Sequence, residues 1–93
     1  MEPPIIKLIA VESKGAYKLR LRFSDGAWGV YDFSRDVEAS TPMTEPLRDT
    51  EFFGRHFIEL GALAWPNGFD LSAEALHRQL KAAGELRRDS KVA

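Results

Sequence analysis

The chain has 93 residues, of which 44% are hydrophobic, so it can form one small domain with a modest core. It contains no cysteine, which excludes disulfides, zinc–thiolate sites, iron–sulfur clusters and thiol catalysis. The 13 basic and 14 acidic residues nearly cancel, but the residues from His77 onward are predominantly basic. That bias fits either an anionic partner or the C-terminal end of a helix, where cations are stabilised.

The N-terminal segment predicts a strand and not a targeting signal. It has no basic region followed by a long apolar run, and no stretch of the chain is long enough to span a membrane. We therefore expect a cytoplasmic protein without a membrane partner. Residues 5–12 are apolar and rich in β-branched side chains after two prolines, which predicts the first strand.

A β-hairpin is predicted over residues 17–32. In residues 17–23, YKLRLRF, apolar and basic side chains alternate, as in a strand with one buried and one solvated face. Asp25 and Gly26 follow, and this dipeptide favours a two-residue type I′ turn between antiparallel strands.

A two-residue turn would fix which side chains share a face. Phe23 would lie opposite Trp28 on the buried face, and Arg20 would lie opposite Tyr31 on the solvated face. By the same register, Asp32 would lie opposite Leu19, on the buried face at the end of the strand.

The rest of the chain predicts short elements and a final helix. We expect a helical turn near Ser34, another near Asp49, short strands at 57–60 and 62–65, and a turn at 66–68. Ser72 suits the N-cap of the last helix, which would bury Leu76 and Leu80 and end near Gly84.

These elements predict an α+β fold: a small antiparallel sheet with a central β-hairpin, short helical turns, and a C-terminal helix packed on the sheet. The expected single domain covers residues 1–86, and residues 87–93 are expected to form a flexible basic tail.

No pattern in the sequence predicts catalysis, a cofactor or a metal. His56 and His77 do not have metal-ligand spacing, and phosphate-loop, dinucleotide-binding and nucleophile-elbow motifs are absent. His77 lies one position from the apolar stripe of the last helix, so we expect it to face solvent. The chain is therefore not expected to be an enzyme.

A basic row on the hairpin is the first candidate surface. Lys18, Arg20 and Arg22 alternate along one strand, with Tyr31 expected beside them. Such a row can follow a phosphate backbone, bind an acidic partner, or simply be a solvated face that prevents strand pairing.

Four further residues are weaker candidates: Asp32, Trp65, Asn67 and Asp70. Asp32 is expected to bond local backbone amides where the chain leaves the sheet. Trp65, like Trp28, is expected in the core, because a small domain needs its large aromatic side chains for folding.

Taken together, the motifs resemble the domain of unknown function 2442 family of small bacterial proteins. The matching segments are YKLRLRF, SDGAWGVYDFS, PLRDTEFF and AWPNGFDLSAEALHRQL, in the order of the family. Phe33 stands where the family usually has an aliphatic residue. The resemblance implies a compact α+β domain with a regulatory or partner-binding role. It also implies that the gene lies beside a gene for a small partner protein, as in toxin–antitoxin pairs. It supplies no catalytic residues.

Three hypotheses for the function follow. The first is a non-catalytic protein-interaction or regulatory module, such as the antitoxin-like partner of a neighbouring gene product or a homodimer. The second is a nucleic-acid-associated transcriptional regulator, although we expect no helix-turn-helix domain after the last helix. The third is an enzyme or small-ligand binder built around Asp32, Trp65 and Asp70.

Overall fold

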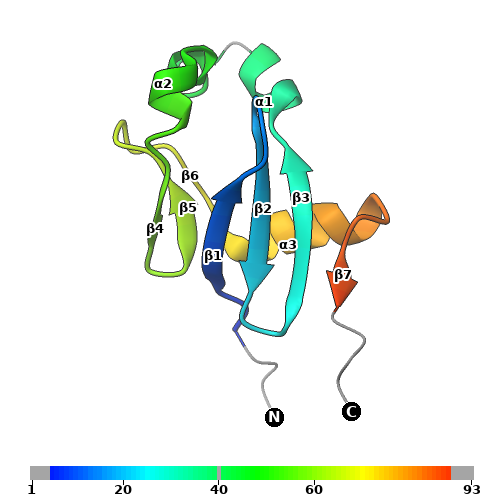
Figure 1. Ribbon diagram of the computed structural model, residues 1–93. Coiled ribbons are helices and arrows are strands. Elements are labelled where there is room, and N and C mark those ends of the chain that lie inside the picture. Colours follow the sequence, from blue (N-terminus) through cyan, green and yellow to red (C-terminus); the bar gives the residue numbers. More distant parts are fainter. Residues whose placement is uncertain (1–4, 40, 89–93) are drawn as a thin grey trace.

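A computed structural model describes residues 5–39 and 41–88 and confirms the antiparallel α+β architecture (Figure 1). One sheet has the strand order β1-β2-β3-β7, and a second has the order β4-β5-β6. The elements are β1 (Leu8–Ser13), β2 (Lys18–Phe23), β3 (Ala27–Asp32), α1 (Ser34–Glu38), the 3-10 helix η1 (Glu45–Arg48), α2 (Thr50–Phe53), β4 (Phe57–Glu59), β5 (Ala62–Ala64), β6 (Asp70–Leu71), α3 (Ala73–Ala82) and β7 (Arg87–Arg88).

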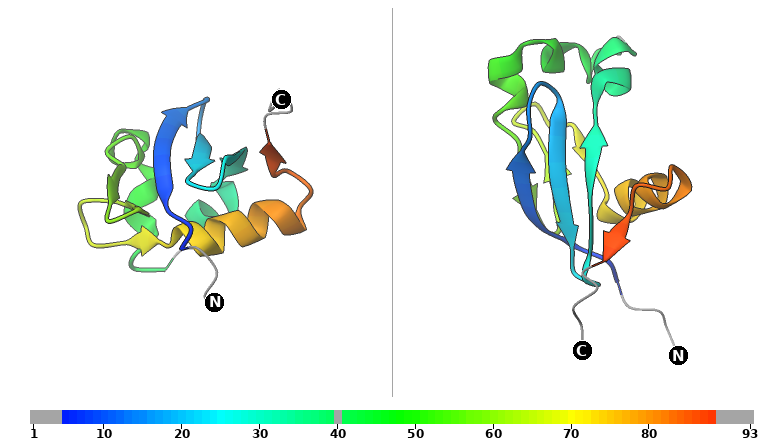
Figure 2. Two further views of the ribbon diagram at one scale, coloured as in Figure 1. Left: turned by 90° about the horizontal axis from the view of Figure 1, so that it is seen from below. Right: turned by 45° about the vertical axis from the view of Figure 1, so that its right-hand side comes forward.

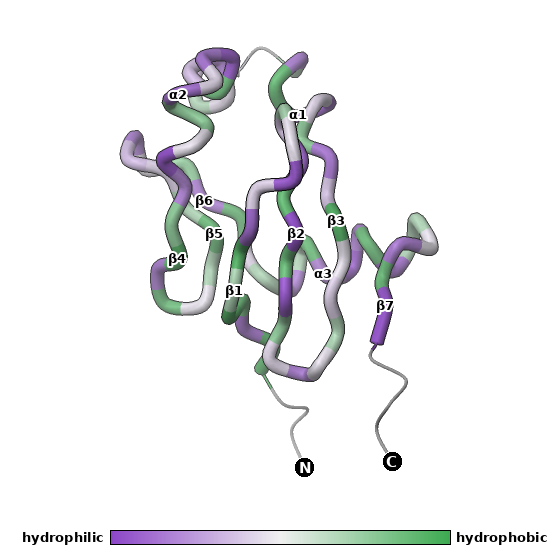
Figure 3. Tube along the Cα trace, viewed as in Figure 1, coloured by the Kyte–Doolittle hydropathy of each residue, from purple (hydrophilic) through white to green (hydrophobic). Residues whose placement is uncertain are grey.

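The alternation predicted along β2 sets the position of the core. Leu19, Leu21 and Phe23 are fully buried, and hydrophobic and hydrophilic residues alternate along this strand in Figure 3. Helix α3 lies across the buried face of the sheet, and the opposite face is not crossed by a helix in the described part of the chain (Figure 2). The four-stranded sheet therefore has one packed face and one open face.

Helix α3 begins and ends where the sequence predicts. The Ser72 hydroxyl accepts a hydrogen bond from the Ala75 amide at 3.1 Å, and Gly84 follows the helix with a φ of 74°. Leu76 and Leu80 are buried against the sheet, as expected. Ala83, the C-cap at the far end of the helix, is exposed.

The hairpin forms, but its expected register is wrong by one residue. The Gly26 amide donates to the Phe23 carbonyl at 3.1 Å, and Gly26 has a φ of 89° whereas Asp25 does not adopt positive φ. The connection is therefore a three-residue loop, in which a type I turn is followed by a left-handed glycine. Arg22 consequently pairs with Trp28.

This one-residue change moves every side chain of β3 to the opposite face. Trp28 lies on the open face beside the arginines and not in the core, contrary to the expectation. Ala27 and Gly29 take the buried positions instead. Asp25 contributes to the longer loop, since its carboxylate accepts a hydrogen bond from the Ala27 amide at 3.0 Å.

The C-terminal segment is tied to the sheet. Strand β7 pairs with β3, with Arg87 opposite Trp28 and Arg88 opposite Ala27. These two residues were expected in the flexible tail but form a strand; residues 89–93 lie outside the described residues. Just before β7, the backbone comes so close to Gly29 that a Cβ atom there would lie 2.8 Å from the Glu85 carbonyl oxygen.

Candidate interaction surface

The open face of the four-stranded sheet carries a cluster of cationic side chains around one tryptophan. Strand β2 contributes the alternating Lys18, Arg20 and Arg22, and the observed register places Trp28 and Arg87 on the same face. We call these five residues the arginine face. No helix or second sheet covers them in the part of the chain shown in Figure 1.

Trp28 is the centre of the arginine face. It lies directly between Arg22 and Arg87 across the sheet, and the guanidinium carbon of Arg20 stands 4.3 Å from its ring centroid. That cation–π contact orients the guanidinium group without neutralising its charge. Arg20 also lies 4.0 Å from the Glu12 carboxylate, an exposed contact that contributes little to stability.

Tyr31, expected beside the basic row, lies on the other face of the sheet. It pairs with Leu19, and its hydroxyl donates to the Gln79 side chain at 2.7 Å, which links β3 to α3. Partial burial raises the pKa of the Tyr31 hydroxyl. The predicted surface therefore loses Tyr31 and gains Trp28 and Arg87.

Asp32 performs the local role predicted for it, but from the opposite face. The register places it opposite Lys18 and exposed, so its expected burial beside Leu19 is wrong. Its carboxylate accepts hydrogen bonds from the Ser34 hydroxyl at 2.7 Å and the Ser34 amide at 2.9 Å. These bonds lower the pKa of Asp32 and hold the chain where it turns into α1.

The other candidate residues belong to the scaffold around the second sheet. Trp65 is buried, and its ring N–H donates to the Phe53 carbonyl at 2.9 Å. Asn67 donates to the Met43 carbonyl at 3.1 Å, which fastens the turn before β6 to a distant loop. Asp70 is exposed in β6 and makes no side-chain hydrogen bond to the described residues. Nothing brings these residues into one site with Asp32.

Contacts of Asp25 with His77 and Arg88, which we call the Asp25 clasp, join the hairpin loop to α3 and β7 and were not predicted. His77 was expected in solvent, but its side chain is only 12% exposed, lies 2.9 Å from the Asp25 carboxylate and packs edge-on against Phe23. Arg88 reaches the same carboxylate at 3.0 Å and the Asp25 carbonyl at 2.8 Å. Partial burial opposes ionisation of Asp25, but the hydrogen bonds from Ala27, His77 and Arg88 outweigh it and lower its pKa.

We expect Asp25→Asn to destabilise the fold by about 1 kcal/mol at neutral pH, because it removes a charged hydrogen-bond acceptor. The lowered pKa means that this stabilisation is present above the unfolded-state pKa of Asp and is lost as pH falls through the folded-state value. Urea unfolding from pH 7 to 3 should therefore show the difference from the wild type shrinking. Asp70→Asn is the matched control, and an equal loss there would contradict a role for the clasp.

Metal sites and membrane-spanning helices are two further possibilities for the described residues. No group of three or more His, Cys, Asp or Glu residues among them could hold a metal ion. The His56 ring nitrogen lies 3.2 Å from the Phe53 carbonyl at the end of α2, so this side chain has a local structural contact. None of the described helices is long and apolar enough to cross a membrane.

The segments that suggested a family span nearly the whole sheet-and-helix unit. The model of a family described as protein of unknown function (DUF2442) matches residues 8–82. The chain belongs to this family. The match starts at the first residue of β1 and ends at the last residue of α3, so it leaves β7 outside. No curated protein and no solved structure matches the chain.

Proposed function

We propose that this member of the domain of unknown function 2442 family is a non-catalytic module that binds another protein through its arginine face. The observation that supports the proposal is Arg20 held over Trp28 between Arg22 and Arg87, on a sheet face without a covering helix in Figure 1. Arginine and tryptophan are the residues most enriched among those that dominate binding energy at protein interfaces.

The charges of the arginine face favour a partner with acidic side chains. A guanidinium group is planar and presents paired donors that match a carboxylate. Arg20 is already oriented by Trp28, so less side-chain entropy is lost when it binds than for a free arginine. An acidic segment laid across the strands would meet Lys18 and the arginines in turn.

Binding to nucleic acid is the less favoured alternative. A base would need a free aromatic face on which to stack, but Arg20 already covers one face of the Trp28 ring. The carboxylates of Glu12 and Asp32 border the basic row, which weakens its attraction for a polyanion. The net charge of the chain, −1, also disfavours binding to a polyanion.

The antitoxin-like role remains a prediction, and it names the first partner to test. We would coexpress the full chain with the product of its adjacent gene and measure their affinity by titration calorimetry. Arg20→Glu is expected to weaken binding by about tenfold or more, because it reverses a charge at the centre of the surface. Arg78→Glu, on the exposed side of α3, is the matched control and should bind as the wild type does.

Two outcomes would overturn the proposal. The first is equal affinity of the wild type and Arg20→Glu for every partner recovered. The second is an enzymatic turnover that is abolished by Asp32→Asn or Asp70→Asn, since neither residue belongs to the arginine face. Salt-dependent binding of RNA or DNA that Arg20→Glu removes would favour the nucleic-acid alternative.

A further inference from the structure

Four of the six residues of β3, from Gly29 to Asp32, have no strand beside them on one edge in the described part of the chain. Strand β7 pairs only with Ala27 and Trp28. The Phe33 amide donates to the Tyr17 carbonyl at 2.8 Å, toward β2, and backbone groups alternate in direction along a strand. The N–H and C=O groups of Val30 and Asp32 must therefore point away from β2, toward the open side.

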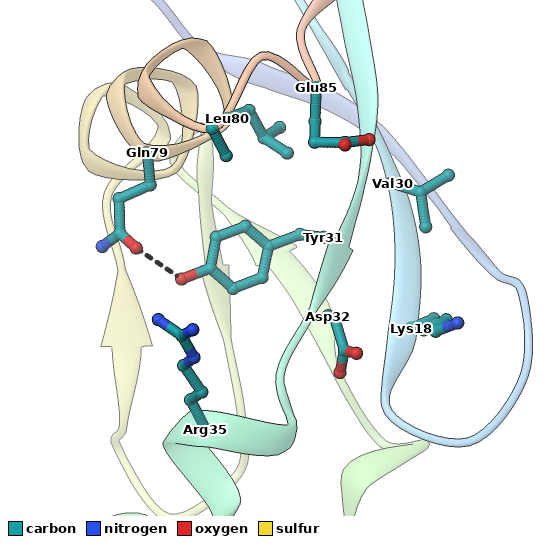
Figure 4. Close-up of a pocket in the computed structure, with 9 residues that line it drawn as sticks. Lys18, Val30, Tyr31, Asp32, Arg35, Gln79, Leu80 and Glu85 are labelled. Carbon is teal, nitrogen blue, oxygen red and sulfur yellow. Dashed lines mark hydrogen bonds between the residues drawn. The ribbon is translucent and has the colours of Figure 1, made fainter.

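A groove of about 480 Å³ runs along this open edge. Its lining comes from both faces of the sheet: Lys18 and Val30 lie on the open face, and Leu80 of α3 lies on the packed face (Figure 4). The helix C-cap Ala83 also lines it. The edge of the strand thus borders the groove. Strand β7 limits this edge at one end and α1 limits it at the other.

We propose that this edge binds an extended segment of a partner protein, which adds an antiparallel strand between β7 and α1. The free groups of Val30 and Asp32 offer two donors and two acceptors to such a strand, and main-chain bonds of this kind supply the affinity when a strand is added to a sheet. The groove shares only Lys18 with the arginine face and does not include Arg20 or Trp28, so the inference goes beyond the function proposed above.

The side chains that line the groove define the chemistry of the segment. The residue opposite Tyr31 would point toward Leu80 and Ala83, where an apolar side chain fits. Arg35 is exposed, lines the groove at its α1 end and extends toward Tyr31 and Gln79 in Figure 4. In the partner segment, an acidic residue two positions before the apolar one would lie near the positive charge of Arg35.

A second copy of the chain paired about Tyr31 does not fit this edge. A twofold pairing around Tyr31 would place Val30 opposite Asp32 of the copy, and would bring Trp28 of the copy level with Ser34. In the copy, however, Trp28 is bonded to its own β7 on that same edge. That strand would occupy the space where α1 begins, so the pairing is blocked.

Hydrogen exchange followed by NMR on the full-length chain can test the edge directly. In the free protein, the Val30 and Asp32 amides should exchange much faster than the Gly29 and Tyr31 amides, which point toward β2. The probe is the blocked pentapeptide Glu-Thr-Val-Thr-Ala, with its valine intended to lie opposite Tyr31. Its addition should protect the Val30 and Asp32 amides and leave those of Gly29 and Tyr31 unchanged.

Two matched comparisons make the result specific. A peptide with proline in place of both threonines cannot donate the main-chain hydrogen bonds and should bind about tenfold more weakly or worse. Arg35→Glu should weaken binding of the original peptide, whereas Arg55→Glu, an exposed cation outside the groove, should not. No natural partner is used, so a failure here is distinguishable from a failure of the arginine face.

Three results would overturn the proposal. In the first, the Val30 and Asp32 amides are as protected as Gly29 and Tyr31 in dilute free protein, which would mean that the edge is closed. In the second, both peptides bind equally. In the third, protection of Val30 and Asp32 rises with protein concentration and without peptide, which would identify a second copy as the occupant.

Discussion

Replacing Trp65 by alanine is expected to lower the free energy of unfolding by about 3–5 kcal/mol, as for other large aromatic residues in cores. The side chain is 1% exposed and contacts the rings of Phe33, Phe53 and Phe69. The substitution would also remove the donor that satisfies the Phe53 carbonyl. Urea unfolding followed by circular dichroism would give the loss.

Trp28→Ala is the matched control, because it removes the same side chain from the open face of the sheet. Trp28 is only partly buried, and the Arg20 guanidinium carbon lies 4.3 Å from its ring centroid. We expect a clearly smaller loss of stability. Equal losses for the two tryptophans would show that the open face is packed as tightly as the core, contrary to the structure.

Replacing Leu76 by alanine should cost about 2–5 kcal/mol, the range for truncating a buried leucine. Leu76 is 1% exposed and faces the sheet from the second turn of α3, so its loss leaves a cavity between helix and strands. The measurement is again the urea midpoint with an unchanged denaturant slope, which separates lost stability from altered compactness.

Leu60→Ala gives the same chemical change in the opposite environment. Leu60 is 96% exposed in the turn between β4 and β5, where we expect a change of stability within about 0.5 kcal/mol. A loss at Leu60 as large as that at Leu76 would mean that the exposed leucine is covered in solution. The two results together therefore test both the core and the exposed surface.

The features that could be predicted from sequence depend on contacts between near neighbours. The alternation along β2 follows from period-two burial, and the start of α3 follows from a serine whose hydroxyl reaches an amide three residues ahead. Such signals lie within a few residues of the structure that they predict. The antiparallel α+β fold could be assembled from them.

The register of the hairpin could not be predicted with the same certainty because Asp25-Gly26 suits two loop lengths. Only the left-handed glycine is common to both loops, and the conformation of Asp25 decides between them. That single choice moved Trp28 into the arginine face and Tyr31 out of it. The candidate site therefore changed while the strands themselves were predicted correctly.

Contacts between distant parts of the chain account for the remaining differences. Arg87 and Arg88 have no strand-like pattern, and they form β7 because β3 offers an edge and Asp25 binds Arg88. One signal was present in the sequence. Gly29 interrupts an otherwise favourable strand, and glycine inside a strand often marks a site where another backbone comes close.

The closeness of Gly29 to Glu85 couples two parts of the chain that lie more than fifty positions apart in sequence. Any larger residue at 29 would push the carbonyl of Glu85 away and displace the chain that leads into β7. The free edge of β3 would then lengthen from four residues to six. Members of the family with a bulkier residue at this position should therefore lack the terminal strand and present a longer surface for strand exchange. The absence of a side chain at Gly29 thus determines how much of the edge of β3 remains unpaired.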